Sequence, residues 1–201
     1  MDFSEIRSHF SPYALIGRTA ISISGGKSMT NEVLNTIRSR RSVRAYKTTA
    51  IPRELLEAVC KAGTYAPTGG GRQSPTIVAV TDEKYRKELS RLNAEVMGAN
   101  TDPYYGAPAI VLVLAEGSAS TFTEDGSCVL ENMMLAAASL GLGSVWVHRE
   151  REIFDGKQGK ALLREWGLPE TLRGVGAIAL GYAKTLPEKE AERKNDYIRY
   201  V

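Results

Sequence analysis

Cysteine and histidine are scarce in this chain, with two residues of each. Cys60 and Cys128 lie in separate apolar runs and form neither a C-x-x-C pair nor a cluster with His9 or His148. These spacings exclude the usual zinc-binding patterns. We therefore expect both cysteines to be reduced thiols in the core, and we expect no metal site.

Long hydrophobic runs are also missing. No apolar stretch reaches the roughly 18 residues that a membrane span requires. The first 30 residues lack the charged, apolar and small-residue regions of a secretory signal. We therefore expect a cytoplasmic protein without a membrane partner. Residues 1–29 show little pattern and are interpreted as an N-terminal extension, and residues 30–201 are interpreted as one domain.

Two nucleotide-binding motifs are absent. The stretch "SGGKS" at residues 24–28 resembles part of a phosphate-binding P-loop, but that motif needs glycine at position 21, where the chain has Ile21. No G-x-G-x-x-G fingerprint of a dinucleotide-binding fold is present either. A nucleoside triphosphate is therefore not the expected ligand.

The excess of positive charge is small, at +3. Acidic residues are interspersed through most segments, which argues against a broad basic surface for nucleic acid. Positive charge gathers instead in "SRRSVR" (39–44), where Arg40, Arg41 and Arg44 stand beside Ser42. We therefore expect a local anion site and no nucleic-acid partner.

Hydrophobic periodicity predicts alternating helices and strands from Thr30 onward. This order of elements favours an α+β or α/β fold of three layers with about four core strands. "YIRYV" (197–201) could add a terminal strand to a sheet edge. The predicted helices begin near residues 30 and 52, then cover 82–96, 123–140 and 160–166, and the predicted strands cover 76–81, 109–115, 144–148 and 175–182.

The helix predicted for residues 123–140 is apolar almost all round, which is typical of a buried helix. Gly141 follows it and suits a left-handed helix end. The apolar positions are Val129, Met133, Met134, Ala137 and Leu140.

The arginine cluster suits a phosphate monoester, which carries about −1.5 to −2 charges near neutral pH. Guanidinium forks and a hydroxyl can satisfy its oxygens with charge-assisted hydrogen bonds. If the segment is extended, Arg40, Ser42 and Arg44 point to the same side. The alternative is a solvated basic end of a helix, which the helix dipole also favours.

A glycine-rich loop, "YAPTGGGRQSP" (65–75), separates a predicted helix from a predicted strand. Three consecutive glycines lose backbone entropy on folding and gain no packing, which indicates close approach of the main chain to a ligand. The alternative is a flexible surface turn.

The third feature is "GLGSVWVHR" (141–149), where the long helix ends and a strand begins. Trp146 and Val147 could offer an apolar wall and main-chain groups to a ligand, although a tryptophan here could also belong to the core. His148 has no carboxylate or cysteine neighbour at metal-ligand spacing.

The ordered set "RRSVR", "APTGGGRQ", "GLGSVW", "LGY" and "ERK" resembles the FMN-dependent nitroreductase family. The resemblance covers roughly residues 30–201. It implies an α+β fold: a three-layer α/β/α sandwich around a central mixed, mainly antiparallel sheet. It also implies a homodimer with FMN bound at the subunit interface.

Position by position, the resemblance assigns the FMN phosphate and ribityl chain to the arginine cluster. In the tail, it implies that Arg193 closes on the same phosphate, with Lys194 as the adjacent candidate. The cluster residues concerned are Arg40, Arg41, Ser42 and Arg44.

The resemblance also implies that the flavin ring contacts the glycine-rich loop of the partner subunit and the end of the strand predicted for residues 144–148. Gly71 replaces an asparagine that many relatives carry, and Pro75 a tryptophan. A lost amide hydrogen bond would weaken FMN binding by on the order of 1 kcal/mol. The ring-binding residues that the resemblance implies are Pro67, Thr68, Gly69, Gly71, Gln73, Trp146, Val147 and His148.

The implied activity is a ping-pong transfer of hydride from NADH or NADPH, through FMN, to a nitroaromatic, quinone or similar electron-poor acceptor. The flavin carries the chemistry, so no catalytic side chain is expected. Three alternatives stay open: a dehalogenase or flavin reductase, a non-catalytic flavin carrier or sensor, and a nucleic-acid-binding module.

Overall fold

The computed structural model describes residues 30–187 and 190–201. The chain divides into two units, residues 1–38 and 39–201, and each is described by itself. In the first unit, helix α1 (Glu32–Ser39) forms as expected. The Asn31 side chain caps its start by accepting a hydrogen bond from Leu34 N–H at 2.9 Å.

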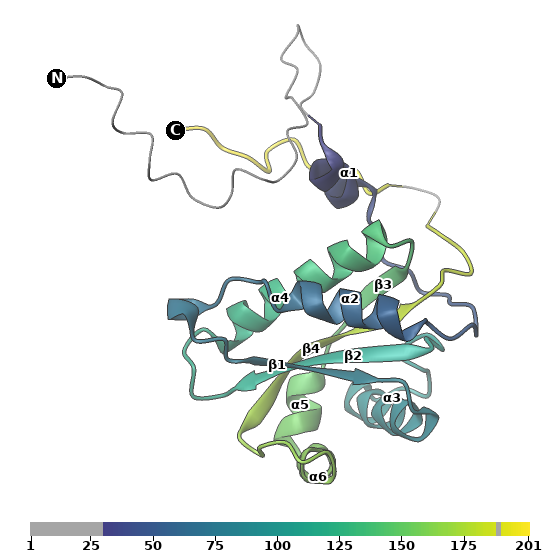
Figure 1. The fold of residues 1–201 in the computed structure, drawn as a ribbon, viewed down its shortest axis with the longest axis vertical. Coiled ribbons are helices and arrows are strands. Elements are labelled where there is room, and N and C mark those ends of the chain that lie inside the picture. Colours follow the sequence, from purple (N-terminus) through teal and green to yellow (C-terminus); the bar gives the residue numbers. More distant parts are fainter. Residues whose placement is uncertain (1–29, 188–189) are drawn as a thin grey trace, which may run out of the picture. The chain divides into compact units, whose positions relative to one another are not determined.

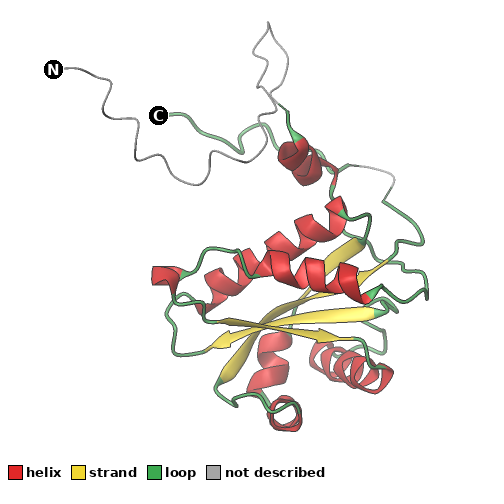
Figure 2. Cartoon of the chain, viewed as in Figure 1, coloured by secondary structure: helices red, strands yellow, loops and turns green. Residues whose placement is uncertain are grey.

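The second unit is an α/β/α sandwich (Figures 1 and 2). Its sheet has four strands in the order β1-β2-β4-β3, and every neighbouring pair is antiparallel. In chain order its elements are α2 (Arg53–Gly63), η3 (Gly69–Gly71), β1 (Pro75–Val80), α3 (Glu83–Met97), β2 (Ala109–Glu116), α4 (Phe122–Ser139), β3 (Gly143–Val147), α5 (Glu150–Asp155), α6 (Lys157–Glu165) and β4 (Leu172–Gly181).

Helices α2 and α4 cover one face of the sheet, and α3, α5 and α6 cover the other (Figure 1). Strand β2 shows why both faces are covered, because its successive apolar side chains point to opposite sides. Val111 and Val113 pack with residues of α2 and α4. Leu112 and Leu114 pack with residues of α3, α5 and α6. The expected three layers and four core strands are confirmed.

The parallel component of the expected mixed sheet is small. Among the described residues, it consists of one isolated parallel bridge between Ser42 and Ser144. The bridge joins the arginine cluster to β3, so it matters for the candidate site.

Two sequence predictions fail in the described part of the chain. Cys128 is exposed rather than buried, because it lies on the same face of α4 as the exposed residues Glu124 and Glu131. Leu140 is also exposed, at 39%, because it follows the end of α4. Residues 197–201 form no strand within the single chain. Helix α5 was not predicted, because its six residues "EREIFD" are mostly polar.

The predicted helix end is confirmed, because Gly141 ends the α4 region with a positive φ of 75°. Cys60, which is half-buried, and Cys128 are free thiols. None of the helices in residues 30–187 and 190–201 is long and apolar enough to cross a membrane.

Candidate functional site

The arginine-bearing segment is fixed to the sheet by its own backbone. Val43 N–H donates to the Ser144 carbonyl at 3.0 Å, and Lys47 N–H donates to the Tyr182 carbonyl at 2.8 Å. Lys184 N–H donates back to the Ala45 carbonyl at 2.8 Å. Residues 43–47 therefore lie along the start of β3 and the end of β4, and Arg40 and Arg41 precede this anchored stretch.

A buried tyrosine adds to this attachment. The Tyr46 hydroxyl lies 2.8 Å from the Val43 carbonyl oxygen and 2.9 Å from that of Ala179 in β4. Burial raises the pKa of Tyr46 well above its usual value, so the hydroxyl stays a hydrogen-bond donor throughout the physiological range.

Close packing at Gly143 also holds the segment. Val43 is only 1% exposed, and a Cβ atom added at Gly143 would lie 2.7 Å from Val43 Cγ2. Any larger residue at position 143 would push the arginine segment away from β3. The glycine therefore has a packing role in the "GLGSVW" motif.

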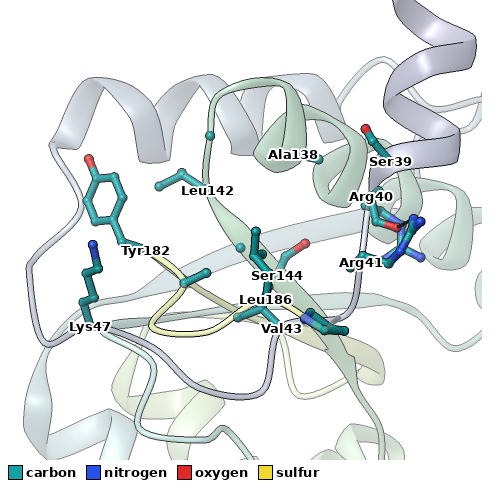
Figure 3. Close-up of a pocket in the computed structure, with 14 residues that line it drawn as sticks. Ser39, Arg40, Arg41, Val43, Lys47, Ala138, Leu142, Ser144, Tyr182 and Leu186 are labelled. Atoms are coloured by element: carbon teal, nitrogen blue, oxygen red, sulfur yellow. Dashed lines mark hydrogen bonds between the residues drawn. The ribbon is translucent and has the colours of Figure 1, made fainter. Parts of the chain in front are cut away.

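A cavity of about 550 Å³ lies beside this segment (Figure 3). In that view, Arg40 and Arg41 lie together at one end of the lining, and Lys47 and Tyr182 lie at the other. Sequence reasoning did not single out Lys47 or Tyr182. The lining consists of Ser39, Arg40, Arg41, Val43, Lys47, Ala138, Gly141, Leu142, Gly143, Ser144, Tyr182, Ala183, Leu186 and Pro187.

Arg40 provides a test of which ligand fits this cavity. Its Nη1 atom is buried and has no hydrogen-bond partner among the described residues. Leaving a buried donor of a charged group unsatisfied is costly. An anion with several oxygens, such as a phosphate, would supply the missing acceptor, and Arg41 and Lys47 add positive charge to the same lining. The residues present therefore fit a phosphate group.

The other residues of the cluster are placed differently. Arg44 is exposed, Ser42 is half-buried, and neither lines the cavity. In an extended segment, Arg40, Ser42 and Arg44 would point to the same side. The cavity is lined instead by the adjacent residues Arg40 and Arg41.

The glycine-rich loop adopts a backbone that favours glycine. Gly70 and Gly71 have φ values of 61° and 69°, and Gln73 has a φ of 52°. Pro67 and Gly71 are exposed, and Thr68 is half-buried. No residue of this loop lines the arginine cavity of the same chain.

Asp125 anchors this loop, and sequence reasoning missed it. Its Oδ1 accepts a hydrogen bond from Gly69 N–H at 2.9 Å, and its Oδ2 accepts one from Ser74 Oγ at 3.1 Å. Asp125 is only 4% exposed. A Cβ atom on Gly69 would collide with the Thr121 side chain, so the loop can approach α4 this closely only with glycine there. The one sequence signal was an acidic residue in the first turn of a helix.

The end of β3 presents the third set of residues. Trp146 is half-buried, Val147 is buried and His148 is exposed. A Cβ atom on Gly176 would lie 2.7 Å from Trp146 Nε1, so this indole packs closely against β4. The next residue, Arg149, has a φ of 86°. Trp146 thus packs against the core while staying partly exposed, and His148 is available at the surface.

The tail reaches the arginine segment through Glu190. Glu190 Oε2 lies 3.1 Å from Arg41 Nη2. Arg193 is exposed, donates to the Ala191 carbonyl at 2.6 Å and lies 4.0 Å from Glu190.

Comparisons with known proteins agree with this geometry. A sequence profile of the Nitroreductase family matches residues 37–182. A Bacteroides fragilis nitroreductase, solved with bound FMN, is 35% identical with a TM-score of 0.79, covering 86% of this chain and 100% of that one. A provisionally named NADH dehydrogenase/NAD(P)H nitroreductase of Archaeoglobus fulgidus is 33% identical over 161 residues, 76% of this chain and 86% of that protein. An NADPH-flavin oxidoreductase of Vibrio harveyi is 29% identical over 175 residues, 79% of this chain and 68% of that protein.

The fold and the motifs define an α+β protein of the nitroreductase type. The chain belongs to the nitroreductase family. The expected family and its fold are confirmed.

Proposed function

We propose that this protein is an FMN-dependent oxidoreductase. It would take reducing equivalents from NADH or NADPH and reduce a small electron-poor acceptor such as a nitroaromatic or a quinone. The observation that carries the proposal is the buried Arg40 Nη1 atom without an acceptor, in a cationic cavity of a nitroreductase-family chain. The FMN bound by the Bacteroides fragilis relative supports the choice of ligand.

Arg40 and Arg41 would hold the FMN phosphate, since both line the cavity. Ser42 and Arg44 would contact the phosphate or the ribityl chain from the same segment. Arg193 would close on the phosphate from the tail. FMN would supply the redox chemistry, taking hydride from NAD(P)H and passing it to the acceptor in a ping-pong cycle.

The flavin ring would lie between two subunits. In support, the glycine-rich loop does not line the arginine cavity of its own chain. Pro67, Thr68, Gly69, Gly71 and Gln73 would therefore serve the site of a partner subunit in a homodimer. Trp146, Val147 and His148 at the end of β3 would flank the ring from the chain that holds the phosphate.

Flavin reductase activity is the second candidate, because the Vibrio harveyi relative is named an NADPH-flavin oxidoreductase. The two candidates differ in the acceptor. Steady-state assays with free flavin, a quinone and a nitroaromatic would separate them.

The colour of the purified protein gives the first test. We expect a yellow protein that releases FMN on denaturation and bleaches under anaerobic conditions when NADH or NADPH is added. Adding a quinone or a nitroaromatic should restore the colour. A folded wild-type protein that neither carries nor binds FMN would contradict the proposal. A protein that binds FMN but stays oxidised with both nicotinamides would be a carrier or sensor.

A further inference from the structure

A buried carboxyl group lies three residues after the end of β3. Glu150, the first residue of α5, is fully buried although its neighbours Arg151 and Glu152 are exposed. The Tyr104 hydroxyl donates to Glu150 Oε1 at 2.8 Å. The second oxygen, Oε2, is buried and has no hydrogen-bond partner within the described part of the chain.

Asn93 of α3 links this carboxyl group to the β3 end. Its Nδ2 atom lies 3.3 Å from Glu150 Oε1 and donates to the His148 carbonyl at 2.8 Å. Its Oδ1 atom accepts from Arg149 Nε at 2.8 Å. Asn93 is fully buried, and in such surroundings hydrogen bonds are electrostatically stronger than in water.

The backbone at this point is strained. Arg149 has a φ of 86°, in the left-handed region that residues with a side chain rarely adopt. Such a conformation persists only where the surroundings determine it. The bonds from Asn93 to the His148 carbonyl and from the Arg149 side chain back to Asn93 are what hold it here.

We infer that Glu150 is a positioning residue for the flavin-facing end of β3: through Asn93 it fixes the His148–Arg149 turn, and thereby the surface offered to the flavin ring. The inference rests on the proposed function, because the same turn is the stretch expected to flank FMN. Glu150 itself is fully buried against β4 and would touch neither the cofactor nor the substrate.

The protonation of Glu150 makes this role measurable. Burial raises the pKa of Glu150 to about 8, so the carboxyl group is largely neutral at pH 7. Since Oε1 already accepts from Tyr104, the proton belongs on Oε2. Removing the proton would place a charge beside Asn93 in a fully buried site, and would change the hydrogen bonds that hold the turn.

Neither of the two titratable or charged groups that act on Glu150 changes its protonation in this range. The titratable or charged groups that act on it are Tyr104, from the loop before β2, and Arg149. Burial raises the pKa of Tyr104 well above its usual value, and arginine stays charged. The packed neighbour in β4 is Gly174, where a Cβ atom would collide with the Glu150 backbone.

The experiment compares wild type with Glu150→Gln and with a control on the same helix, Glu152→Gln. Glutamine keeps an oxygen acceptor for Tyr104 but cannot lose a proton. FMN dissociation constants would be measured by flavin fluorescence from about pH 7, where the phosphate is already mostly doubly ionised, to about pH 9.5, across the ionisation of Glu150. We expect the affinity of wild type and of Glu152→Gln to fall by roughly fivefold or more as the pH rises through this range. Glu150→Gln should stay at the affinity of the low-pH wild type.

A second measurement does not need the cofactor. Amide hydrogen exchange of residues 146–151 in the ligand-free proteins, corrected for the intrinsic effect of pH, should accelerate at high pH in wild type and stay constant in Glu150→Gln. The inference is overturned if wild type and Glu150→Gln show the same pH dependence in FMN affinity or in exchange. Failure of every variant to bind FMN would contradict the proposed function instead, and the exchange data would still decide the role of Glu150.

Discussion

Glu190 Oε2 lies 3.1 Å from Arg41 Nη2, so a carboxylate from the tail pairs with an arginine that lines the cavity. The side chain of Glu190 places negative charge where a phosphate is expected. It would therefore compete with the ligand for Arg41.

Removing that carboxylate should strengthen FMN binding. We expect Glu190→Gln to bind FMN more tightly by up to about fivefold, because an exposed ion pair of roughly 0.2–1 kcal/mol no longer opposes the phosphate. Binding of riboflavin, which has no phosphate, should not change. Isothermal titration calorimetry with both ligands gives the comparison, and Glu192→Gln is the matched control. Equal tightening for riboflavin would show that the carboxylate acts on something other than the phosphate site.

Arg40 and Arg44 should differ as phosphate ligands. Arg40→Ala removes the buried guanidinium, and we expect FMN affinity to fall by about tenfold or more, since hydrogen bonds to charged groups contribute roughly 1.5–3 kcal/mol. Arg44→Ala should cause a smaller loss, because Arg44 is exposed and does not line the cavity. Folding of both variants, checked by circular dichroism, should be intact. A larger loss for Arg44→Ala would mean that the cavity described here is not the phosphate site.

Glu150 should make the protein less stable as the pH rises. Its pKa is raised from 4.5 to about 8 on folding, so between these values the folded state binds a proton that the unfolded state has lost. The free energy of unfolding therefore declines as the pH rises from about 4.5 to about 8, and levels off above the folded-state pKa.

We expect Glu150→Gln to remove this decline and to be more stable than wild type at alkaline pH by a few kcal/mol. Urea unfolding of the ligand-free proteins at acidic and alkaline pH is the measurement. Exposed Glu152→Gln should follow wild type. A parallel pH dependence in Glu150→Gln would show that this carboxyl group is not the source.

Asp125 should stabilise the glycine-rich loop. Asp125→Ala removes the acceptor for Gly69 N–H and Ser74 Oγ, and we expect a loss of about 1–3 kcal/mol in the free energy of unfolding. Limited proteolysis should then cut within residues 67–73 sooner than in wild type. Glu124→Ala, at an exposed neighbouring position, is the control. Unchanged stability and cleavage would mean that Asp125 does not hold this loop.

The sequence predicted the main elements well where hydrophobic patterning was strong. Strand β2, with its continuous apolar run, was located within one residue at its end. The short helix α5 was missed, because four of its six residues are charged and the segment is too short to show a helical hydrophobic period. Burial of Glu150 depends on Asn93, Tyr104 and β4, which are distant along the chain, so no local pattern could indicate it.

The candidate site was predicted in part. The clustered arginines identified the segment, yet only the folded chain shows that Arg40 Nη1 lacks an acceptor. Lys47 and Tyr182 join the lining because the segment pairs with the end of β4, a contact between residues far apart in sequence. The glycine-rich loop was recognised, but Asp125, which anchors it, lies 56 residues after Gly69 in the chain.

The attachment of Tyr46 to Ala179 has a consequence for how the ligand arrives. Since the sheet already holds this stretch of backbone, binding demands little loss of main-chain entropy, and association should be fast with a modest heat-capacity change. Apoprotein made in flavin-starved cells should accordingly take up cofactor on mixing, without first being refolded.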